Sequence, residues 1–458
     1  MRSAHRSALA LACSCFTACH QPQGAETVVV VTWDTVRTEL LLGTERTWDT
    51  TPNLDDFFDD ATVFPRMLTP RGLTGPALSS MLTGAYPHKH GVRDNRGDAP
   101  RFPTLMDRFQ DAGYTTWAYS ANMCQIIASG VDRTECTSPA EIDSGSRQER
   151  DVILVDRLVD DLAGLRDGQH LFLWLHLAHP HDPYELVEPW YSEFHPQSYQ
   201  GDLDPGSAND VRGVTFSTLE YSEQDRDHME AAYASQIRET DQLTARVFSE
   251  LDKVGRYEDA VVVFGVDHGE ELADHNRYFA HGCSPYNSVL NVVYAFRAPG
   301  VTPAGVWLES WRSPVDVAPT VVELANAFEW QEGGESRSLL SAMTSTEDAD
   351  EPVFFERGVH TAGVVWHEAK YIYSGETEFD DCHPYSGSGH TYPTEQEELY
   401  DLVMDPDELS NLAGQDLALQ GELRSKLCDW VLESAWVSTG QQMADNALVI
   451  MCMSDAAR

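Results

Sequence analysis

The chain has 458 residues, more than one ordinary hydrophobic core needs and enough for a large domain with a smaller one. Hydrophobic residues make up 42% of it and charged residues 23%, close to the globular average, so the composition excludes wholesale disorder. With 74 acidic and 31 basic side chains the formal net charge is -43, which argues against nucleic acid and anionic membrane surfaces as partners. The acidic residues are spread along the chain, a pattern that suits a protein kept soluble at high salt.

The N-terminus has the pattern of a secretory signal peptide. Basic residues precede the apolar run Ala8–Ala18, which is too short to span a bilayer, and we assign residues 1–24 to the leader. The stretch FTAC, which ends at Cys19, resembles a bacterial lipobox with Phe16 in place of the usual Leu. Two outcomes stay open, a lipidated cysteine and an ordinary cleaved leader. We therefore expect an exported protein, in the periplasm, on the outer membrane or outside the cell, whose membrane contact, in the first outcome, is the lipid anchor alone.

Six cysteines remain after the leader, and none of them has a CxxC or Cys/His zinc spacing. In an exported chain such cysteines can pair, and the nearest two, Cys124 and Cys136, are the expected bridge. The others are Cys283, Cys382, Cys428 and Cys452.

Three apolar runs predict buried parallel strands: the β-branched run Val28–Thr32, and the runs Leu171–Leu177 and Ala260–Val266. Between the last two, apolar side chains recur at helical spacing along one face: Met229, Tyr233, Ile237, Thr244, Phe248 and Leu251. Strands that alternate with amphipathic helices predict an α/β fold with a large, mainly parallel sheet flanked by helices. Functional sites in such sheets gather at the carboxyl ends of the strands.

We predict that the chain divides into a large domain over 25–330 and a small C-terminal α+β domain over 352–438. Residues 185–223 are rich in Pro, Gly, Ser and Asp, which predicts a long surface insertion near the site. The polar, acidic stretch 331–351 is the expected linker, and the tail 439–458 gives no clear signal.

Polar, chemically capable residues follow each predicted strand. Asp34 ends the first, HPHDPY follows the second, and DHGEE, with Asp267 and His268, follows the third. A carboxylate next to an imidazole after a buried strand is a ready pair of metal ligands. Thr74 precedes Gly75 and Pro76 and predicts a helix N-cap, where backbone N–H groups and the helix dipole favour an anionic ester.

Four longer stretches carry a family resemblance: TPNLDDFF, MLTGAYPHKHG, SPVDVAPTVVELA and ELYDLVMDPDELSNLA. In this order they make the chain, from Val28 to about Leu412, resemble the sulfatase family within the alkaline-phosphatase superfamily. The resemblance implies a metal-dependent hydrolase of sulfuric or phosphoric esters.

The resemblance also implies a role for particular residues. The metal ligands would be Asp34, Thr74, Asp267 and His268, with Thr74 also in the position of the nucleophile. The side chains at the substrate would be Asn95, His181, His281 and, in the same loop as Asn95, Lys89. One divalent metal ion is expected, and the ligand set suits calcium, magnesium, manganese or zinc.

The sequence departs from the sulfatase pattern at the nucleophile. Sulfatases read C-x-P-S-R or S-x-P-S-R and oxidise the first residue to formylglycine, whereas this chain reads TGPAL, with Leu78 in place of the arginine. The Asp-Asp doublet of sulfatases is here Trp33-Asp34. The remaining set, Asp34, Thr74, Asp267 and His268, resembles the site of threonine-dependent phosphotransferases such as lipoteichoic acid synthases. This resemblance favours a phosphate diester, a phosphonate or a phospholipid head group over a sulfate ester as the substrate.

Three alternatives remain at this level. The first is a transferase that passes a phosphoryl head group to an envelope acceptor, although such enzymes carry transmembrane helices and this sequence shows none. The second is a non-catalytic binding protein on a sulfatase scaffold. The third is a two-metal enzyme, because the alternating His176, His179 and His181 could bind zinc.

Overall fold

A computed structural model describes residues 24–42, 48–95, 99–127, 130–136, 147–195, 197–215, 219–275, 279–330, 335–345, 350–375, 396–433 and 446–456. Residues 1–23 of the predicted leader, with Cys19, and Cys382 lie outside these residues.

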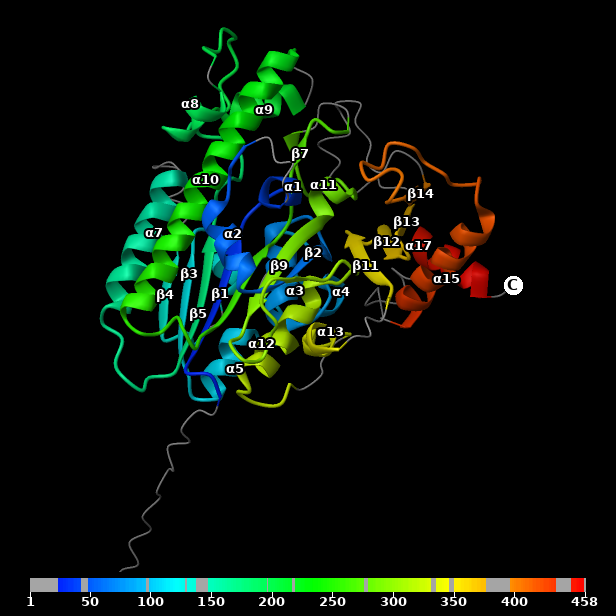
Figure 1. Cartoon of the computed structure of the whole chain (residues 1–458). Coiled ribbons are helices and arrows are strands. Elements are labelled where there is room, and N and C mark those ends of the chain that lie inside the picture. Colours follow the sequence, from blue (N-terminus) through cyan, green and yellow to red (C-terminus); the bar gives the residue numbers. More distant parts are fainter. Residues whose placement is uncertain are drawn as a thin grey trace, which may run out of the picture.

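The main domain is built on an eight-stranded sheet with the order β10-β2-β9-β6-β1-β5-β3-β4 (Figure 1). Its strands are β1 (Thr27–Trp33), β2 (Thr62–Leu68), β3 (Thr115–Ser120), β4 (Arg133–Cys136), β5 (Leu171–Leu177), β6 (Val261–Val266), β9 (Asn291–Arg297) and β10 (Val306–Trp307). All pairs are parallel except those of β9, which runs antiparallel to β2 and β6. The three predicted strands are confirmed as β1, β5 and β6, which lie side by side at the centre of the sheet.

Helices cover both faces of this sheet, and the central strands are therefore buried along their whole length. One group packs around the long helix α10, whose start is fixed by a capping box between Ser222 and Asp225. It comprises α2 (Pro52–Asp59), α7 (Arg147–Leu162), α8 (Trp190–Phe194) and α10 (Glu223–Lys253). The other group comprises α3 (Thr74–Thr83), α5 (Leu105–Asp111) and α12 (Val317–Ala325). The predicted α/β fold is therefore confirmed.

Short elements complete the main domain. They are α1 (Thr38–Leu41), α4 (Pro87–His90), α9 (Ala208–Thr215), α11 (Asn287–Leu290), the 3-10 turns η1 (Cys124–Ile126) and η2 (Pro314–Asp316), and the antiparallel pair β7 (Glu271–Leu272) and β8 (Phe279–Ala280). The predicted insertion contains α8 and α9. Thr215, at the end of α9, donates its hydroxyl to the carbonyl of Phe279 at 3.1 Å, so the insertion reaches the strand that precedes His281.

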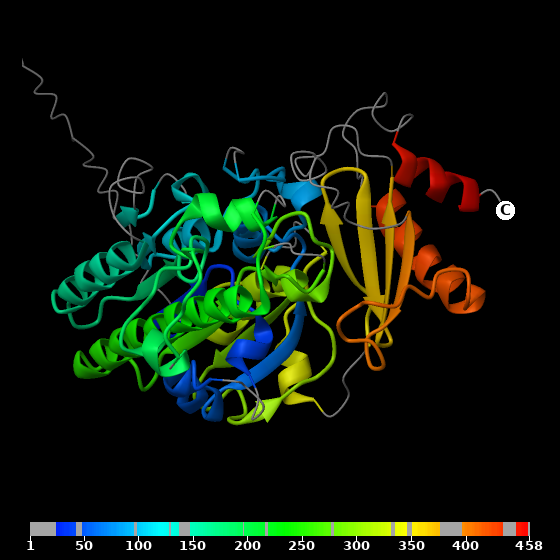
Figure 2. The ribbon, with the colours of Figure 1, turned by 90° about the horizontal axis from the view of Figure 1, so that it is seen from above.

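The C-terminal domain is a four-stranded antiparallel sheet with two helices on its outer side (Figure 2). Its elements are β11 (Val353–Arg357), β12 (Thr361–Trp366), β13 (Ala369–Ser374), β14 (Glu397–Asp401), α15 (Leu417–Glu433) and α17 (Ala447–Ala456). Side chains alternate between its faces: Val364 and Tyr371 pack under the helices, whereas Val365 and Ile372 pack against main-domain residues such as Trp311. The strands are thus shared between two cores.

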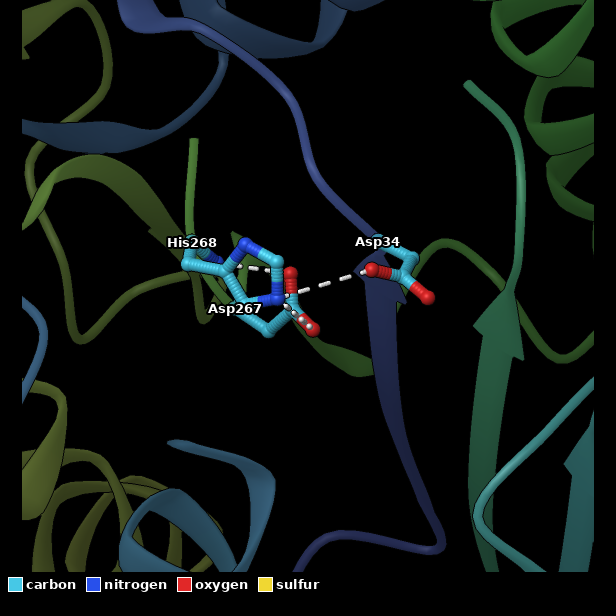
Figure 3. A group of neighbouring side chains, drawn as sticks. All are labelled: Asp34, Asp267 and His268. Atoms are coloured by element: carbon cyan, nitrogen blue, oxygen red, sulfur yellow. Dashed lines mark hydrogen bonds and ion pairs between the residues drawn. The ribbon is translucent and has the colours of Figure 1, made fainter. Parts of the chain in front are cut away.

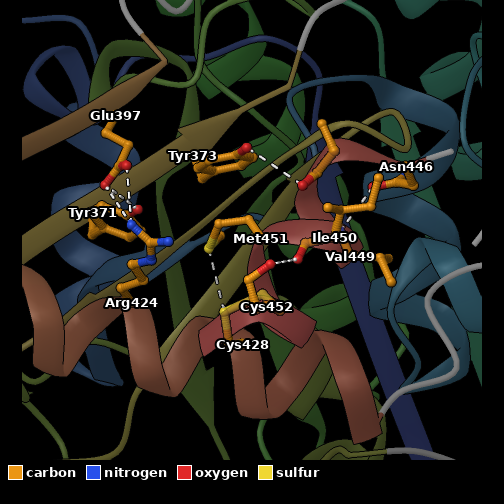
Figure 4. The surroundings of a disulfide bond; sticks show 12 residues. Tyr371, Tyr373, Glu397, Arg424, Cys428, Asn446, Val449, Ile450, Met451 and Cys452 are labelled. Atoms are coloured by element: carbon orange, nitrogen blue, oxygen red, sulfur yellow. Dashed lines mark hydrogen bonds and ion pairs between the residues drawn. A yellow bond between two sulfur atoms is a disulfide. The ribbon is translucent and has the colours of Figure 1, made fainter. Parts of the chain in front are cut away.

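Two parts of this region go beyond what the sequence indicated. The segment expected as a linker contains α13 (Leu340–Thr344), and the segment set apart as a tail contains α17. A disulfide between Cys428 and Cys452 ties α17 to α15 (Figure 4). Two consecutive apolar residues of α17, Leu448 and Val449, are buried in the same core.

The expected disulfide between Cys124 and Cys136 is also present. It joins η1, after β3, to the end of β4. Within the described part of the chain, no helix combines the length and the apolar character needed to cross a bilayer.

Candidate metal and ester site

Three buried side chains converge where β1 and β6 end (Figure 3). Asp34 follows β1, and Asp267 and His268 follow β6, so pairing of the two strands brings residues more than 230 positions apart to one edge of the sheet. His268 Nε2 lies 3.7 Å from Asp34 Oδ1 and 3.6 Å from Asp267 Oδ2. Among the described residues this is the one group of carboxylates and imidazoles close enough to share a metal ion.

The donor atoms of this group fit a cation. The Nδ1 atom of His268 donates to the carbonyl of Gly269 at 2.9 Å, which leaves a lone pair on Nε2. Asp267 Oδ1 accepts the backbone N–H groups of Thr35 and His268, whereas its buried Oδ2 has no hydrogen-bond partner. His268 Nε2, Asp34 Oδ1 and Asp267 Oδ2 thus face one another with their lone pairs, and no donor bonds to Asp267 Oδ2. A positive ion between these atoms would stabilise the arrangement. Oxygen and imidazole ligands of this kind suit several divalent metals.

The electrostatics of the two carboxylates point the same way. Burial and the charge of Asp34 raise the pKa of Asp267 well above its usual value. Burial would raise the pKa of Asp34 too, but the imidazoles of His181, His268 and His176 outweigh it and hold that pKa below its usual range. Burial lowers the pKa of His268 to about 3, so its ring is neutral at pH 7. Without a cation the group therefore carries one carboxylate whose ionised form is strongly disfavoured.

Two residues that hold Asp34 were not recognised from the sequence. Asn122 donates its side-chain amide to Asp34 Oδ2 at 2.6 Å, and the hydroxyl of Thr35 donates to Oδ1. Thr35 also has a backbone φ of 61°, a left-handed conformation that is uncommon for a β-branched residue. The signal in the sequence was position: Asn122 follows β3, just as Asp34 follows β1.

Thr74 lies beside this group at the start of α3. Its Oγ1 is 3.3 Å from His268 Nε2. The N-cap is Leu73 and Thr74 is the first helical residue, so the predicted N-cap was wrong by one position. The shift matters, because a capping hydroxyl would bond to its own helix, whereas this one is directed at the metal-ligand group. Leu78, where sulfatases carry arginine, is fully buried in the core.

Asn95 approaches the same helix start. Its Oδ1 accepts the backbone N–H of Gly75 at 2.8 Å, next to Thr74. A Cβ atom on residue 75 would lie 3.0 Å from this oxygen, so glycine allows the close approach. The hydrogen bond fixes the Asn95 amide next to the predicted nucleophile.

His181 and His281 come together from different loops. Their ring centroids are 4.8 Å apart, and the His281 ring is 4.4 Å from that of His268. Nδ1 of His181 lies 2.7 Å from Asp182 Oδ1, and Nδ1 of His281 lies 3.1 Å from Glu270 Oε1. The structure thus places both predicted histidines beside the metal-ligand group, each with its Nδ1 against an acidic side chain.

Lys89 has a different neighbour. Its ammonium group pairs with Glu335 at 2.9 Å, and Glu335 also accepts the indole N–H of Trp430. This contact lies beyond the far end of α3, next to the C-terminal domain, and is not shared with the residues around Thr74.

The alternating histidines do not gather at one point. His176 Nε2 is 3.9 Å from Asp34 Oδ2, and burial lowers the pKa of His176 to about 4. His179 instead faces Asp151 and Glu239, at 3.8 and 3.6 Å, and His181 faces His281. In the described part of the chain these three side chains do not form a second metal group.

Comparison with known proteins agrees with this geometry. The sulfatase family model matches residues 26–327. The chain is 26% identical to the multifunctional alkaline phosphatase superfamily protein PehA of Trinickia caryophylli, over 84% of this chain and 90% of that protein. It is 21% identical to the choline-sulfatase of Rhizobium meliloti (strain 1021), over 79% and 77% of the two chains.

Solved structures share the fold at low identity. The phosphonate monoester hydrolase of Agrobacterium radiobacter superposes with a TM-score of 0.70 at 18% identity, covering 90% of this chain and 96% of that one. A protein solved in complex with its substrate D-glucosamine-2-N,6-O-disulfate superposes with a TM-score of 0.71 at 17% identity, covering 90% and 98%. Fold and site together define a hydrolase of the alkaline-phosphatase superfamily. Within that superfamily, the chain belongs to the sulfatase family.

Proposed function

We propose that the protein hydrolyses a phosphate diester or a phosphonate monoester, with the hydroxyl of Thr74 as the nucleophile. The observation that carries the proposal is the position of Thr74 Oγ1, 3.3 Å from His268 and beside two buried carboxylates. A threonine cannot form the formylglycine of sulfatases, and buried Leu78 supplies no arginine to support one. A sulfate ester is the second candidate, and similarity to the choline-sulfatase favours it.

The residues divide the reaction between them. Asp34, Asp267 and His268 would hold a divalent cation, which supplies positive charge for the attacking oxygen and for the oxygens of the ester. The Thr74 oxygen attacks phosphorus and loses its proton to solvent, while the bond from phosphorus to the leaving oxygen breaks. His281 or His181 gives a proton to that leaving oxygen, and Asn95 binds an ester oxygen.

Water then completes the cycle. It attacks the phosphothreonine in line, its oxygen stays on phosphorus, and its proton returns to the Thr74 oxygen. The histidine recovers a proton from solvent. Atoms and charge balance over the two steps, and the products are an alcohol and a phosphate monoester or a phosphonate.

The test uses purified protein loaded in turn with calcium, magnesium, manganese and zinc. Aryl phosphate diesters, phosphonates, phosphate monoesters and sulfates are the substrates. Thr74→Ala should lower kcat by about 10³-fold or more while metal content stays unchanged. Thr83→Ala is the control, since Thr83 is a buried threonine of the same helix whose hydroxyl donates to Ser79. Mass spectrometry of rapidly quenched enzyme should find the phosphoryl group on Thr74.

Two results would reject the proposal. Full activity in Thr74→Ala would exclude this nucleophile. Absence of both bound metal and turnover in the wild type would favour a binding protein on the same scaffold.

A further inference from the structure

A carboxylate outside the metal-ligand group, that of Glu270, joins the loops that carry His181 and His281. Glu270 follows β6 and is fully buried. Its Oε1 lies 3.1 Å from Nδ1 of His281, and its Oε2 accepts the hydroxyl of Tyr184 at 3.1 Å. Tyr184 belongs to the loop after β5, three residues beyond His181. One side chain therefore connects the His181 loop with His281.

The contact with Glu270 constrains the His281 ring. A carboxylate oxygen next to Nδ1 favours the tautomer with its proton on Nδ1, so that the second nitrogen, Nε2, is the one presented on the opposite edge of the ring. That ring lies 4.4 Å from the ring of His268 and 4.8 Å from that of His181. The contact with Glu270 thus leaves Nε2 as the nitrogen on the edge of the His281 ring away from Glu270.

The neighbouring residue shows that this arrangement is not a general property of the segment. Glu271 is equally buried but faces the other way. It accepts hydrogen bonds from Ser284 and Ser288 and contacts His275, in a polar cluster near the C-terminal domain. Burial of a carboxyl group costs free energy unless hydrogen bonds compensate. For Glu270, both of the compensating bonds go to loops of the site.

We propose that Glu270 is a positioning residue that fixes the tautomer and orientation of His281 and, through Tyr184, links His281 to the His181 loop. The inference rests on the hydrolase function proposed above. It assigns the transfer of a proton to the leaving oxygen to Nε2 of the protonated His281 ring, which then remains as the neutral ring with its proton on Nδ1. The bond from phosphorus to that oxygen breaks as the proton arrives, and solvent restores the proton to His281.

The kinetic test compares Glu270→Gln with Glu271→Gln in the metal-loaded enzyme. The substrates are aryl phosphate diesters whose leaving phenols differ in acidity. Glu270→Gln should lower kcat about 10- to 100-fold for the least acidic phenols, with little change for the most acidic ones or in KM. Glu271→Gln should leave the leaving-group dependence unchanged. Tyr184→Phe, which removes one hydroxyl, should shift the dependence in the same direction by a smaller factor.

A second readout needs no turnover. In the metal-loaded Thr74→Ala protein, at a pH where the ring is neutral, ¹⁵N NMR of His281, assigned by comparison with His281→Gln, should show the proton on Nδ1, and Glu270→Gln should weaken that preference. A neutral His281 ring with its proton on Nε2 instead of Nδ1, or an equal leaving-group dependence in Glu270→Gln and wild type, would overturn the inference. Activity in Thr74→Ala alone would instead overturn the proposed function, so the two failures are distinguishable.

Discussion

Replacing Asp267 by Asn should reverse the order of stability of wild type and variant when metal is removed. The side chain is fully buried, its Oδ1 accepts two backbone N–H groups, and its Oδ2 has no hydrogen-bond partner. Asparagine keeps the two accepted bonds and removes an ionisable group whose charged form is disfavoured by burial and by Asp34. In excess chelator, Asp267→Asn should therefore be at least as stable as wild type.

Metal should restore the wild-type advantage. A free metal concentration 100 times the dissociation constant raises the free energy of unfolding of wild type by about 2.7 kcal/mol. If the loss of one carboxylate ligand weakens binding about 100-fold, the same concentration stabilises Asp267→Asn by about 0.4 kcal/mol. The difference, about 2 kcal/mol, is large enough to measure.

The assay is urea unfolding in chelator and in excess metal. Asp241→Asn is the control, because Asp241 is a fully buried carboxylate that accepts bonds from Asn53 and Leu54, away from the site. Its metal-dependent gain should equal that of wild type. An undiminished gain in Asp267→Asn, or no gain in wild type with any of the four metals, would refute the assignment of this group as a cation site.

Three further predictions concern the rest of the chain. Burial lowers the pKa of His90 to about 3, below the ordinary value of 6.5, so this side chain should contribute a fall in the free energy of unfolding of about 1.4 kcal/mol per pH unit as pH drops below 6.5. In urea unfolding, the free energy of unfolding of His90→Asn should fall less steeply with decreasing pH than that of wild type. Equal slopes would contradict the lowered pKa of His90. Replacing Cys124 and Cys136 by Ser should lower the free energy of unfolding by about 2–3 kcal/mol, measured by urea unfolding. It should also weaken metal binding, measured by calorimetry, because Asn122, which donates a hydrogen bond to Asp34, lies two residues before Cys124. Raising NaCl from 0.05 to 1 M should raise the melting temperature, since salt screens the repulsion of a chain with net charge -43, and calorimetry that finds no rise would count against such repulsion.

Much of the scaffold could be predicted because it rests on local pattern. The continuous apolar runs of β1, β5 and β6 predicted buried strands, and the spacing of Met229, Tyr233 and Ile237 specified the buried face of α10. Elements with weaker patterns were missed. The helix α17 is one of these, because its position depends on packing against α15 and on a disulfide that links residues 24 positions apart.

For the site, the sequence determined which residue types stand at the strand ends: Asp34, Thr74, Asp267 and His268. Only the tertiary structure decided which neighbours they meet. Strand pairing brings Asn122 to Asp34 across 88 positions and Tyr184 to Glu270 across 86. The direction of the Thr74 hydroxyl and the pairing of Lys89 with Glu335 depend likewise on backbone conformation and on distant segments. Hydrogen bonds and charges act over a few ångströms in space, and sequence separation does not measure that distance.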